Sequence, residues 1–354
     1  MKTVKKIFLP ALVLILLGQG CMFGEKEAPL APDGGMWQTE DAGLTWTQLD
    51  SLPGSTDIGT ISGVNISAFE IDPSDKTAYY IGTEQNGMFY SINSGNVWQR
   101  PESQDVRNGF IRDIEVDPRN VCTIYVLRSY QLFKSTDCNR TYEAMYSETR
   151  EDEHFTSLAI DWFNPDTLYL GNSAGEILRS TDNAKNWTRI YRLSDKIRSV
   201  ELSNKDSRII LVGTGDRGIY RSPDAGETWQ HFEKEIGAEF KDSDIFYNFA
   251  QNRDGSVLIM NSKYGLLRST DAGANWNSIR LTTPPGDVRI WGVAVHPDNP
   301  DILYYGTMGI IYSSSNGGES WATQEMPSTR ASKIMSVHPE KTDRLIVGFA
   351  AIEQ

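Results

Sequence analysis

One short phrase occurs seven times along the chain, and it constrains the fold more than any other feature of the sequence. The seven copies read TEDAGLTW (39–46), SINSGNVW (91–98), STDCNRTY (135–142), STDNAKNW (180–187), SPDAGETW (222–229), STDAGANW (269–276) and SSNGGESW (314–321). They recur on average about every 46 residues. A steady period of this length is typical of repeat architectures, in which each unit packs on its neighbours.

Each period also repeats the same order of local signals. In the first full period, an alternating run at 64–73 ends in an Asp-Pro turn, and further strand-like runs follow at 77–83 and 87–92. The phrase then leads into a short run that ends near Arg100. Only 231–240 has the pattern of a helical turn. Four short strands in a unit of this length predict one blade of a β-propeller.

The two ends of the chain carry the two halves of one more unit. Residues 34–49 supply only third and fourth strands, and residues 332–354 supply only first and second strands. Pairing these halves leaves no free sheet edge at the seam. We therefore expect an all-β fold: a single seven-bladed β-propeller over residues 36–354, with four-stranded blades and one composite blade that closes the ring.

The acidic position of the phrase has a structural explanation. It lies in the turn between the third and fourth strands, where an Asp or Asn side chain accepts backbone N–H groups and a following Gly permits a positive φ. The final Trp starts the outer strand and packs on the neighbouring sheet. We therefore expect turn caps, and not catalytic groups, at Asp41, Asn93, Asp137, Asp182, Asp224, Asp271 and Asn316.

The phrase is identified as the Asp-box, also called the bacterial neuraminidase repeat. Seven copies in one chain resemble the photosystem II assembly-factor propellers of cyanobacteria and chloroplasts, and the propeller of the sortilin ectodomain. The resemblance covers residues 34–354 and implies a seven-bladed propeller. It is specific for fold and weak for function, because enzymes and binding proteins share this repeat.

The N-terminal segment resembles a targeting signal. Three lysines precede an apolar run at 7–17 that is too short to span a bilayer. Cys21 then follows a small residue, as in bacterial lipoproteins, although Gly18 stands where that pattern usually has Leu. We expect a signal peptide at 1–20, a lipidated Cys21 with a tether over 21–35, and a membrane-anchored lipoprotein on the periplasmic or cell-surface side. Secretion without lipidation is the alternative.

Composition argues against several classes of ligand. The formal net charge of −13 does not suit a nucleic-acid-binding protein. With three Cys and four His, and no two His close together, a Cys/His metal module is not expected. GTGDRG (213–218) matches the dinucleotide fingerprint, but a strand-like run follows it where a helix is needed. We therefore expect no nucleotide, no metal and no cofactor.

The sequence also lacks the marks of the glycosidases that use this repeat. The sialidases that this repeat resembles have six blades and an Arg-Ile-Pro signature, which is absent here. The xyloglucan-cleaving enzymes with a similar blade pattern have two propellers and a cleft between them, whereas this chain is expected to form one propeller. We therefore expect that the chain is not an enzyme and that it binds a protein or peptide, as an assembly factor for an envelope or membrane complex does. A glycan-acting hydrolase or lectin is the alternative, because 47 acidic residues always offer carboxylate pairs.

Alignment of the first strands of the blades reveals cations and aromatic residues at one shared position. This position lies near the start of the strand, at the channel mouth opposite the phrase turns. Arg and aromatic side chains anchor interfaces, and focused positive potential attracts carboxylates. The pattern predicts a rim that binds a protein or an acidic peptide; the alternative is that its cations pair with neighbours such as Asp113 and Glu201. The rim residues are Arg112, Arg198, Tyr247, Trp291 and Lys333.

Two cysteines are expected to form a disulfide. Cys122 opens the second strand of its blade, and Cys138 follows the third. Adjacent antiparallel strands bring the start of one beside the end of the next, and an extracytoplasmic location permits oxidation. Two buried free thiols are the alternative.

Overall fold

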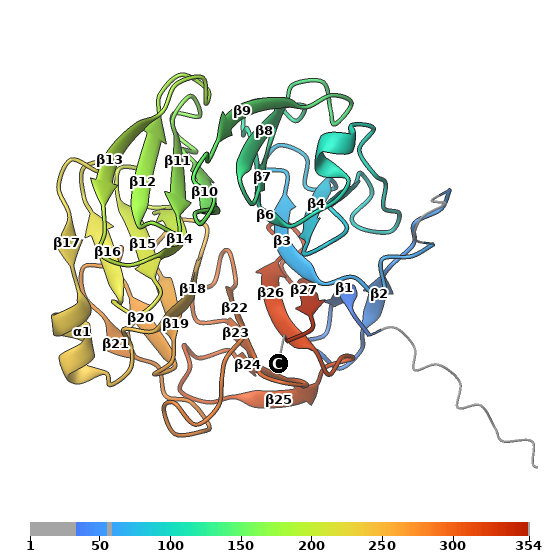
Figure 1. The fold of residues 1–354 in the computed structure, drawn as a ribbon. Helices are drawn as coiled ribbons and strands as arrows, with labels where there is room; N and C mark the ends of the chain where they lie inside the picture. Colours follow the sequence, from blue (N-terminus) through green and yellow to red (C-terminus); the bar gives the residue numbers. More distant parts are fainter. Residues whose placement is uncertain (1–32, 55–58, 353–354) are drawn as a thin grey trace, which may run out of the picture. The chain divides into compact units, whose positions relative to one another are not determined.

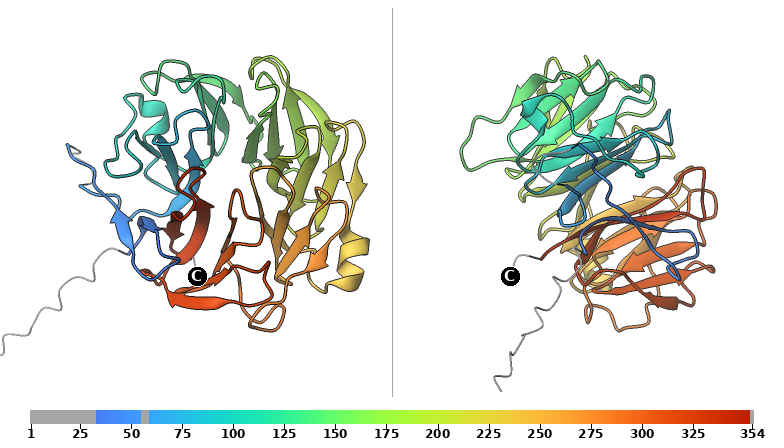
Figure 2. Two further views of the ribbon diagram at one scale, coloured as in Figure 1. Left: turned by 180° about the vertical axis from the view of Figure 1, so that it is seen from behind. Right: turned by 90° about the vertical axis from the view of Figure 1, so that its right-hand side faces the viewer.

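Seven antiparallel β-sheets form a ring in the computed structural model, which describes residues 33–54 and 59–352 (Figure 1). Each sheet is one blade, and the innermost strands of all blades face the common axis, as the reverse view in Figure 2 also shows. We number the blades 1 to 7 from residue 66 onward. The described residues form one compact unit. The expected signal peptide, Cys21 and most of the tether lie outside the described residues.

In blades 1 to 6 the strands run outward from the axis in chain order. The inner strands are β3 (Ile66–Ile71), β6 (Ile111–Val116), β10 (Phe155–Ile160), β14 (Ile197–Leu202), β18 (Phe246–Gln251), β22 (Gly292–Val295) and β26 (Ala331–Val337). The second strands are β4 (Tyr79–Thr83), β7 (Ile124–Arg128), β11 (Leu168–Asn172), β15 (Ile210–Thr214), β19 (Leu258–Ser262), β23 (Leu303–Gly306) and β27 (Leu345–Ala350). The third strands are β5 (Met88–Ser91), β8 (Gln131–Ser135), β12 (Glu176–Ser180), β16 (Ile219–Ser222), β20 (Leu266–Ser269), β24 (Ile310–Ser314) and β1 (Gly35–Thr39). The outer strands are β9 (Glu143–Ser147), β13 (Thr188–Arg192), β17 (Gln230–His231), β21 (Asn277–Ser278), β25 (Ala322–Glu325) and β2 (Thr47–Leu49).

Blade 7 contains both ends of the chain. Its strand order is β26, β27, β1, β2, so that the inner half comes from the C-terminal segment and the outer half from the N-terminal segment. Trp37 lies opposite Val347 in the pairing of β1 with β27, and Met36 lies opposite Leu49 in the pairing of β1 with β2. The ring is therefore closed through hydrogen-bonded strands, as the sequence predicts.

Blade 1 has a reduced outer edge. Its sheet contains three strands, and the position of the fourth is held by a single bridge between Tyr90 and Gln99. Pro101 follows this bridge and has no N–H group to extend the ladder. The chain then enters a 3₁₀ turn, η1 (Gln104–Val106).

The core lies between neighbouring blades, where seven separate apolar clusters are found. Close approach of one blade to the next depends on glycine in the second strand. A Cβ placed at Gly213 in β15 would lie 2.1 Å from the Phe246 ring of the next blade. This glycine opens the GTGDRG segment, which ends β15 and turns into β16, with Gly218 at φ 69°. The strand β16 follows this segment, and α1 (Glu233–Glu239), at the position of the expected helical turn, comes only after β17, although its first residue lies beside Gly218. The strand–turn–helix order of the dinucleotide fingerprint is therefore absent, and the glycines serve packing and the turn.

The seven repeated turns share one hydrogen-bond pattern. In each, the first Ser or Thr hydroxyl accepts the N–H group four residues later at 2.8–3.2 Å. The Asp or Asn Oδ1 at the third position accepts the N–H group four residues after it at 2.8–3.0 Å. All seven expected turn residues are therefore satisfied within their own blade.

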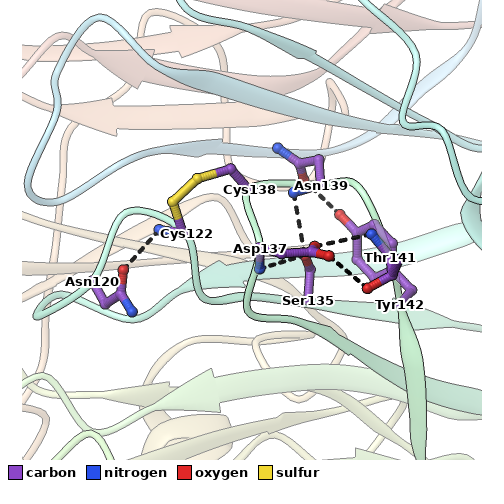
Figure 3. The surroundings of a disulfide bond; sticks show 8 residues. All are labelled: Asn120, Cys122, Ser135, Asp137, Cys138, Asn139, Thr141 and Tyr142. Carbon is purple, nitrogen blue, oxygen red and sulfur yellow. Dashed lines mark hydrogen bonds between the residues drawn. A yellow bond between two sulfur atoms is a disulfide. The ribbon is translucent and has the colours of Figure 1, made fainter.

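The turn of blade 2 also contains a disulfide. Cys122 and Cys138, with Cα atoms 4.0 Å apart, are joined by an S–S bond beside the hydrogen bonds of Asp137 (Figure 3). The Cys138 N–H donates to the Cys122 carbonyl at 3.3 Å. The bond therefore links the start of the second strand to the end of the third, as expected from the antiparallel order.

Candidate ligand-binding rim

Four of the five rim residues occupy β-bulges. The ladder between the inner and second strands skips one residue in blades 1 to 5 and two residues in blade 7. Arg112, Arg198 and Tyr247 are the skipped residues of blades 2, 4 and 5, and Lys333 is one of the two skipped in blade 7. Trp291 immediately precedes β22. Bulges re-aim side chains without ending the sheet, so the repeat presents one variable position per blade at the same end of the ring.

Arg112 and Arg198 form no ion pair with any other described residue. The Nε atoms of both are buried and have no hydrogen-bond acceptor among the residues that the structure describes. The Arg112 guanidinium lies 3.9 Å from the centre of the Phe110 ring. Burial lowers the pKa of Arg112 from its usual value. These two cations therefore retain unmet capacity to bind an anion.

Neither arginine is compensated by the carboxylates that the sequence suggested as partners. Asp113 Oδ2 accepts the Leu158 N–H at 2.9 Å, and Glu201 Oε1 accepts the Ser199 hydroxyl at 3.1 Å. The two arginines therefore do not pair with Asp113 or Glu201 in the structure.

Lys333 differs from the arginines. Its Nζ lies 2.8 Å from Glu84 Oε1, on the turn between β4 and β5 of blade 1. Glu84 also accepts a hydrogen bond from the Asn65 amide at 2.9 Å. Lys333 is therefore neutralised within the rim and is a weaker candidate for anion binding than the sequence alone suggested.

Tyr247 and Trp291 hold a further cation that sequence alignment missed. The Arg289 guanidinium lies 3.9 Å from the centre of the Trp291 ring and 4.6 Å from that of Tyr247. The buried Trp291 Nε1 has no acceptor among the described residues. Arg289 escaped notice because it precedes the strand by a few positions, outside the aligned column. The signal was present in the sequence RIW (289–291), where a cation lies two residues from a rim aromatic.

The repeated turns at the opposite face contain carboxylates whose negative charge is satisfied by nearby hydrogen-bond donors. Hydrogen bonds from Thr141 lower the pKa of Asp137 to about 2, and the Asn186 side chain does the same for the pKa of Asp182. A carboxylate held by several donors is a stable anion and a poor proton donor. These residues cap turns in the structure.

The described part of the chain offers neither a metal centre nor a membrane-spanning helix. Within residues 33–54 and 59–352, no three His, Cys, Asp or Glu side chains gather closely enough to hold a metal ion. In the same ranges, no helix is long and apolar enough to cross a membrane.

The structure is a seven-bladed β-propeller with arginine and aromatic side chains at one mouth of its channel. No family model matches the sequence. The photosystem II assembly lipoprotein Ycf48 of Synechococcus sp. (strain CC9902) is 23% identical over 212 residues, which cover 49% of this chain and 63% of that protein. The oligoxyloglucan-reducing end-specific xyloglucanase of Emericella nidulans is 26% identical over 219 residues, 53% of this chain and 26% of the enzyme. Rat sortilin is 22% identical over 180 residues, 50% of this chain and 21% of sortilin. The chain thus spans less than two thirds of the length of these relatives.

The similar solved structures likewise include GH74 enzymes and YCF48 proteins. A GH74 enzyme from Niastella koreensis matches 81% of this chain and 51% of its own, with a TM-score of 0.65 and 17% identity. The structure of YCF48 bound to D1 peptide matches 82% of this chain and 94% of its own, with a TM-score of 0.62 and 14% identity. At these identities the matches establish a shared propeller fold.

These comparisons correct one expectation. The sequence-based conclusion that the chain is not an enzyme is contradicted, because xyloglucanases match it as strongly as the assembly factors do. The missing Arg-Ile-Pro signature excluded sialidases alone, and the lack of a second propeller does not exclude the hydrolases that share this blade pattern.

Proposed function

We propose that the rim binds a carboxylate-bearing segment of a partner protein or an acidic peptide. The observation that carries the proposal is the pair of rim guanidiniums, Arg112 and Arg198, whose buried Nε donors lack acceptors among the described residues. An unpaired buried donor costs free energy until a ligand supplies an acceptor. A bidentate carboxylate matches the geometry of a guanidinium.

The aromatic half of the rim supports the same class of ligand. Tyr247, Trp291 and Arg289 form a stacked cation–aromatic group at the same end of the ring as Arg112 and Arg198. Such groups bury large area at little conformational cost and are common anchors of protein interfaces. A solved propeller of similar fold, YCF48, is bound to the D1 peptide, so a peptide is a ligand of that protein.

We further propose that the mature chain is held at a membrane through Cys21, on the extracytoplasmic side. The leader at 1–20 supports this, and one similar protein is itself named a lipoprotein. The substitution Cys21→Ala is expected to move the protein from the membrane fraction to the soluble fraction. A wild-type protein that is already soluble would contradict the anchor.

The rim is tested by isothermal titration of a short peptide rich in Asp and Glu with a free C-terminal carboxylate. Arg112→Gln combined with Arg198→Gln is expected to weaken binding at least about tenfold, since a hydrogen bond to a charged group contributes about 1.5–3 kcal/mol. Lys333→Gln is the matched control, because its charge is already paired with Glu84 and its removal is expected to change affinity much less. Equal losses in the two variants would place the site elsewhere.

A second candidate function, hydrolysis of a β-glucan chain, is favoured by the xyloglucanase matches. It predicts release of new reducing ends when the full chain is incubated with xyloglucan. No release above a heat-denatured control would remove this candidate, and it would leave the rim proposal unaffected.

A further inference from the structure

A cavity of about 230 Å³ lies among the inner strands, at the end of the channel away from the rim. Its walls come from the C-terminal halves of β3, β6, β10 and β14, whereas the rim lies at the starts of these strands. Three carboxylates and an aliphatic wall face the cavity beside one indole ring. These residues are Glu70, Glu115, Glu201, Ile160, Leu202 and Trp162.

The carboxylates of this cavity form no direct ion pair with a described protein cation. Among the described residues, no hydrogen bond or ion pair to Glu70 or Glu115 is found, and Glu201 accepts only the Ser199 hydroxyl. The charged groups that face the cluster from the surrounding elements are themselves engaged. Lys76 donates to the Asp72 and Pro73 carbonyl oxygens, Arg253 pairs with Asp298 at 2.8 Å, Asp113 accepts the Leu158 N–H, and Asp72 accepts the Ser74 and Asp75 N–H groups.

Burial and repulsion between neighbouring carboxylates both raise the pKa values of these acids, because both disfavour the ionised form. They raise the pKa of Glu70 to about 8 and that of Glu201 to about 7, and the pKa of Glu115 lies well above its ordinary value. Lys76 opposes the shift at Glu70 without abolishing it. The cavity therefore has a deficit of positive charge that a ligand can supply.

The apolar and aromatic lining of the cavity selects the kind of cation. Glu70, Glu115 and Glu201 come from three different inner strands, and within the described residues no three acidic or metal-ligating side chains form a group that could hold a metal ion. The aliphatic wall formed by Ile160 and Leu202 suits methylene groups. At the mouth, Trp162 is 43% exposed and stacks edge-on with Phe163, which is 79% exposed. Aromatic faces near carboxylates favour organic cations.

We propose that this cavity binds a primary alkylammonium group carried on a methylene stem, either in a polyamine or in a lysine side chain of a partner. The ammonium lies among Glu70, Glu115 and Glu201, and the stem packs on the aliphatic wall and Trp162. This site is independent of the rim and of the ligand proposed there.

The test is isothermal titration of the full chain with spermidine at pH 8 and low salt. Saturable binding is expected, with proton release that appears as a dependence of the heat on the buffer, because the acids must ionise to hold the cation. Affinity is expected to rise from pH 6 to pH 8. The neutral analogue 1,8-octanediol should not bind. A blocked tri-lysine peptide forms the second arm: tighter binding than spermidine assigns the site to a partner's lysine, and weaker binding assigns it to a polyamine.

The double variant Glu115→Gln, Glu201→Gln is expected to weaken spermidine binding at least tenfold. Glu143→Gln on the exposed outer strand β9 removes the same type of charge far from the channel, and it should bind as the wild type does. Folding is checked in the same proteins: Glu115→Gln should melt at a higher temperature than the wild type, and spermidine should raise the melting temperature of the wild type but not that of the double variant. No saturable binding of either amine, equal losses in Glu143→Gln, or binding of octanediol would overturn the proposal.

Discussion

The two faces of the propeller are built from aligned positions in every blade, but they use polar residues in opposite ways. At the repeated turns, each Asp or Asn meets its donors within eight residues of chain, and all seven copies make the same bonds. At the rim, the aligned position changes identity from blade to blade, and the Nε atoms of two of its cations lack hydrogen-bond acceptors among the described residues. The turns are thus satisfied by their own segment of chain, whereas the rim keeps hydrogen-bond donors without acceptors, as the proposed ligand requires.

The largest effect is expected at the turn face, from loss of the disulfide. Cys122→Ser with Cys138→Ser releases a loop of 16 residues, which corresponds to about 3 kcal/mol of unfolding free energy in the chain-entropy model. Urea denaturation of the variant measures it, and reduced wild type should show the same loss. If both proteins unfold at the wild-type urea concentration, the bond does not stabilise the fold.

A smaller loss is expected from a single turn residue. Ser222 is fully buried and accepts the Gly226 N–H at 2.8 Å, so Ser222→Ala leaves that donor unpaired at a cost of about 1–3 kcal/mol. The affinity for the acidic peptide should not change. Ser278→Ala on the exposed edge is the matched control. Weaker peptide binding by Ser222→Ala would contradict the separation of the two faces.

Stability is expected to peak near pH 4 to 5, because the two groups of carboxylates titrate in opposite directions. Asp137 and Asp182 have folded pKa values of about 2, below the unfolded value, so their contribution is lost as pH falls from 4 to 2. Glu201 and Glu70 have folded pKa values of about 7 and 8, above the unfolded value, so the folded state binds more protons and loses stability as pH rises from 5 to 8.

Denaturation across this pH range checks both slopes. Glu201→Gln should flatten the part between pH 5 and 8, and Glu143→Gln should leave it unchanged. A stability that rises steadily to pH 8 would be inconsistent with uncompensated acids in the channel.

The smallest change in stability is expected at the rim. Arg198 forms no ion pair among the described residues, so Arg198→Gln should alter the unfolding free energy by less than about 0.5 kcal/mol. A loss of more than about 1 kcal/mol in the same assay would show that Arg198 stabilises the fold.

Contacts between residues close in sequence, such as the hydrogen bonds within turns, could be predicted from the sequence. Contacts between side chains of different blades could not, because they form only when the ring closes. His296 and His338 precede Pro as Asp72 does, and their Nδ1 atoms accept the following N–H groups in the same way, so the local sequence suffices to predict this role. The pairing of Lys333 with Glu84 joins residues 249 apart and carried no local signal. The carboxylates of the channel cavity likewise meet only when four blades surround the axis.

The most direct test of the account asks which face holds the acidic peptide. A benzophenone-bearing amino acid is placed either at Tyr130, a half-exposed residue beside Arg112 on the rim, or at Leu44, an exposed residue of a repeated turn. Irradiation with the peptide, followed by mass spectrometry, should give an adduct from position 130 and none from position 44. An adduct from position 44 alone would contradict the assignment of the rim as the binding surface.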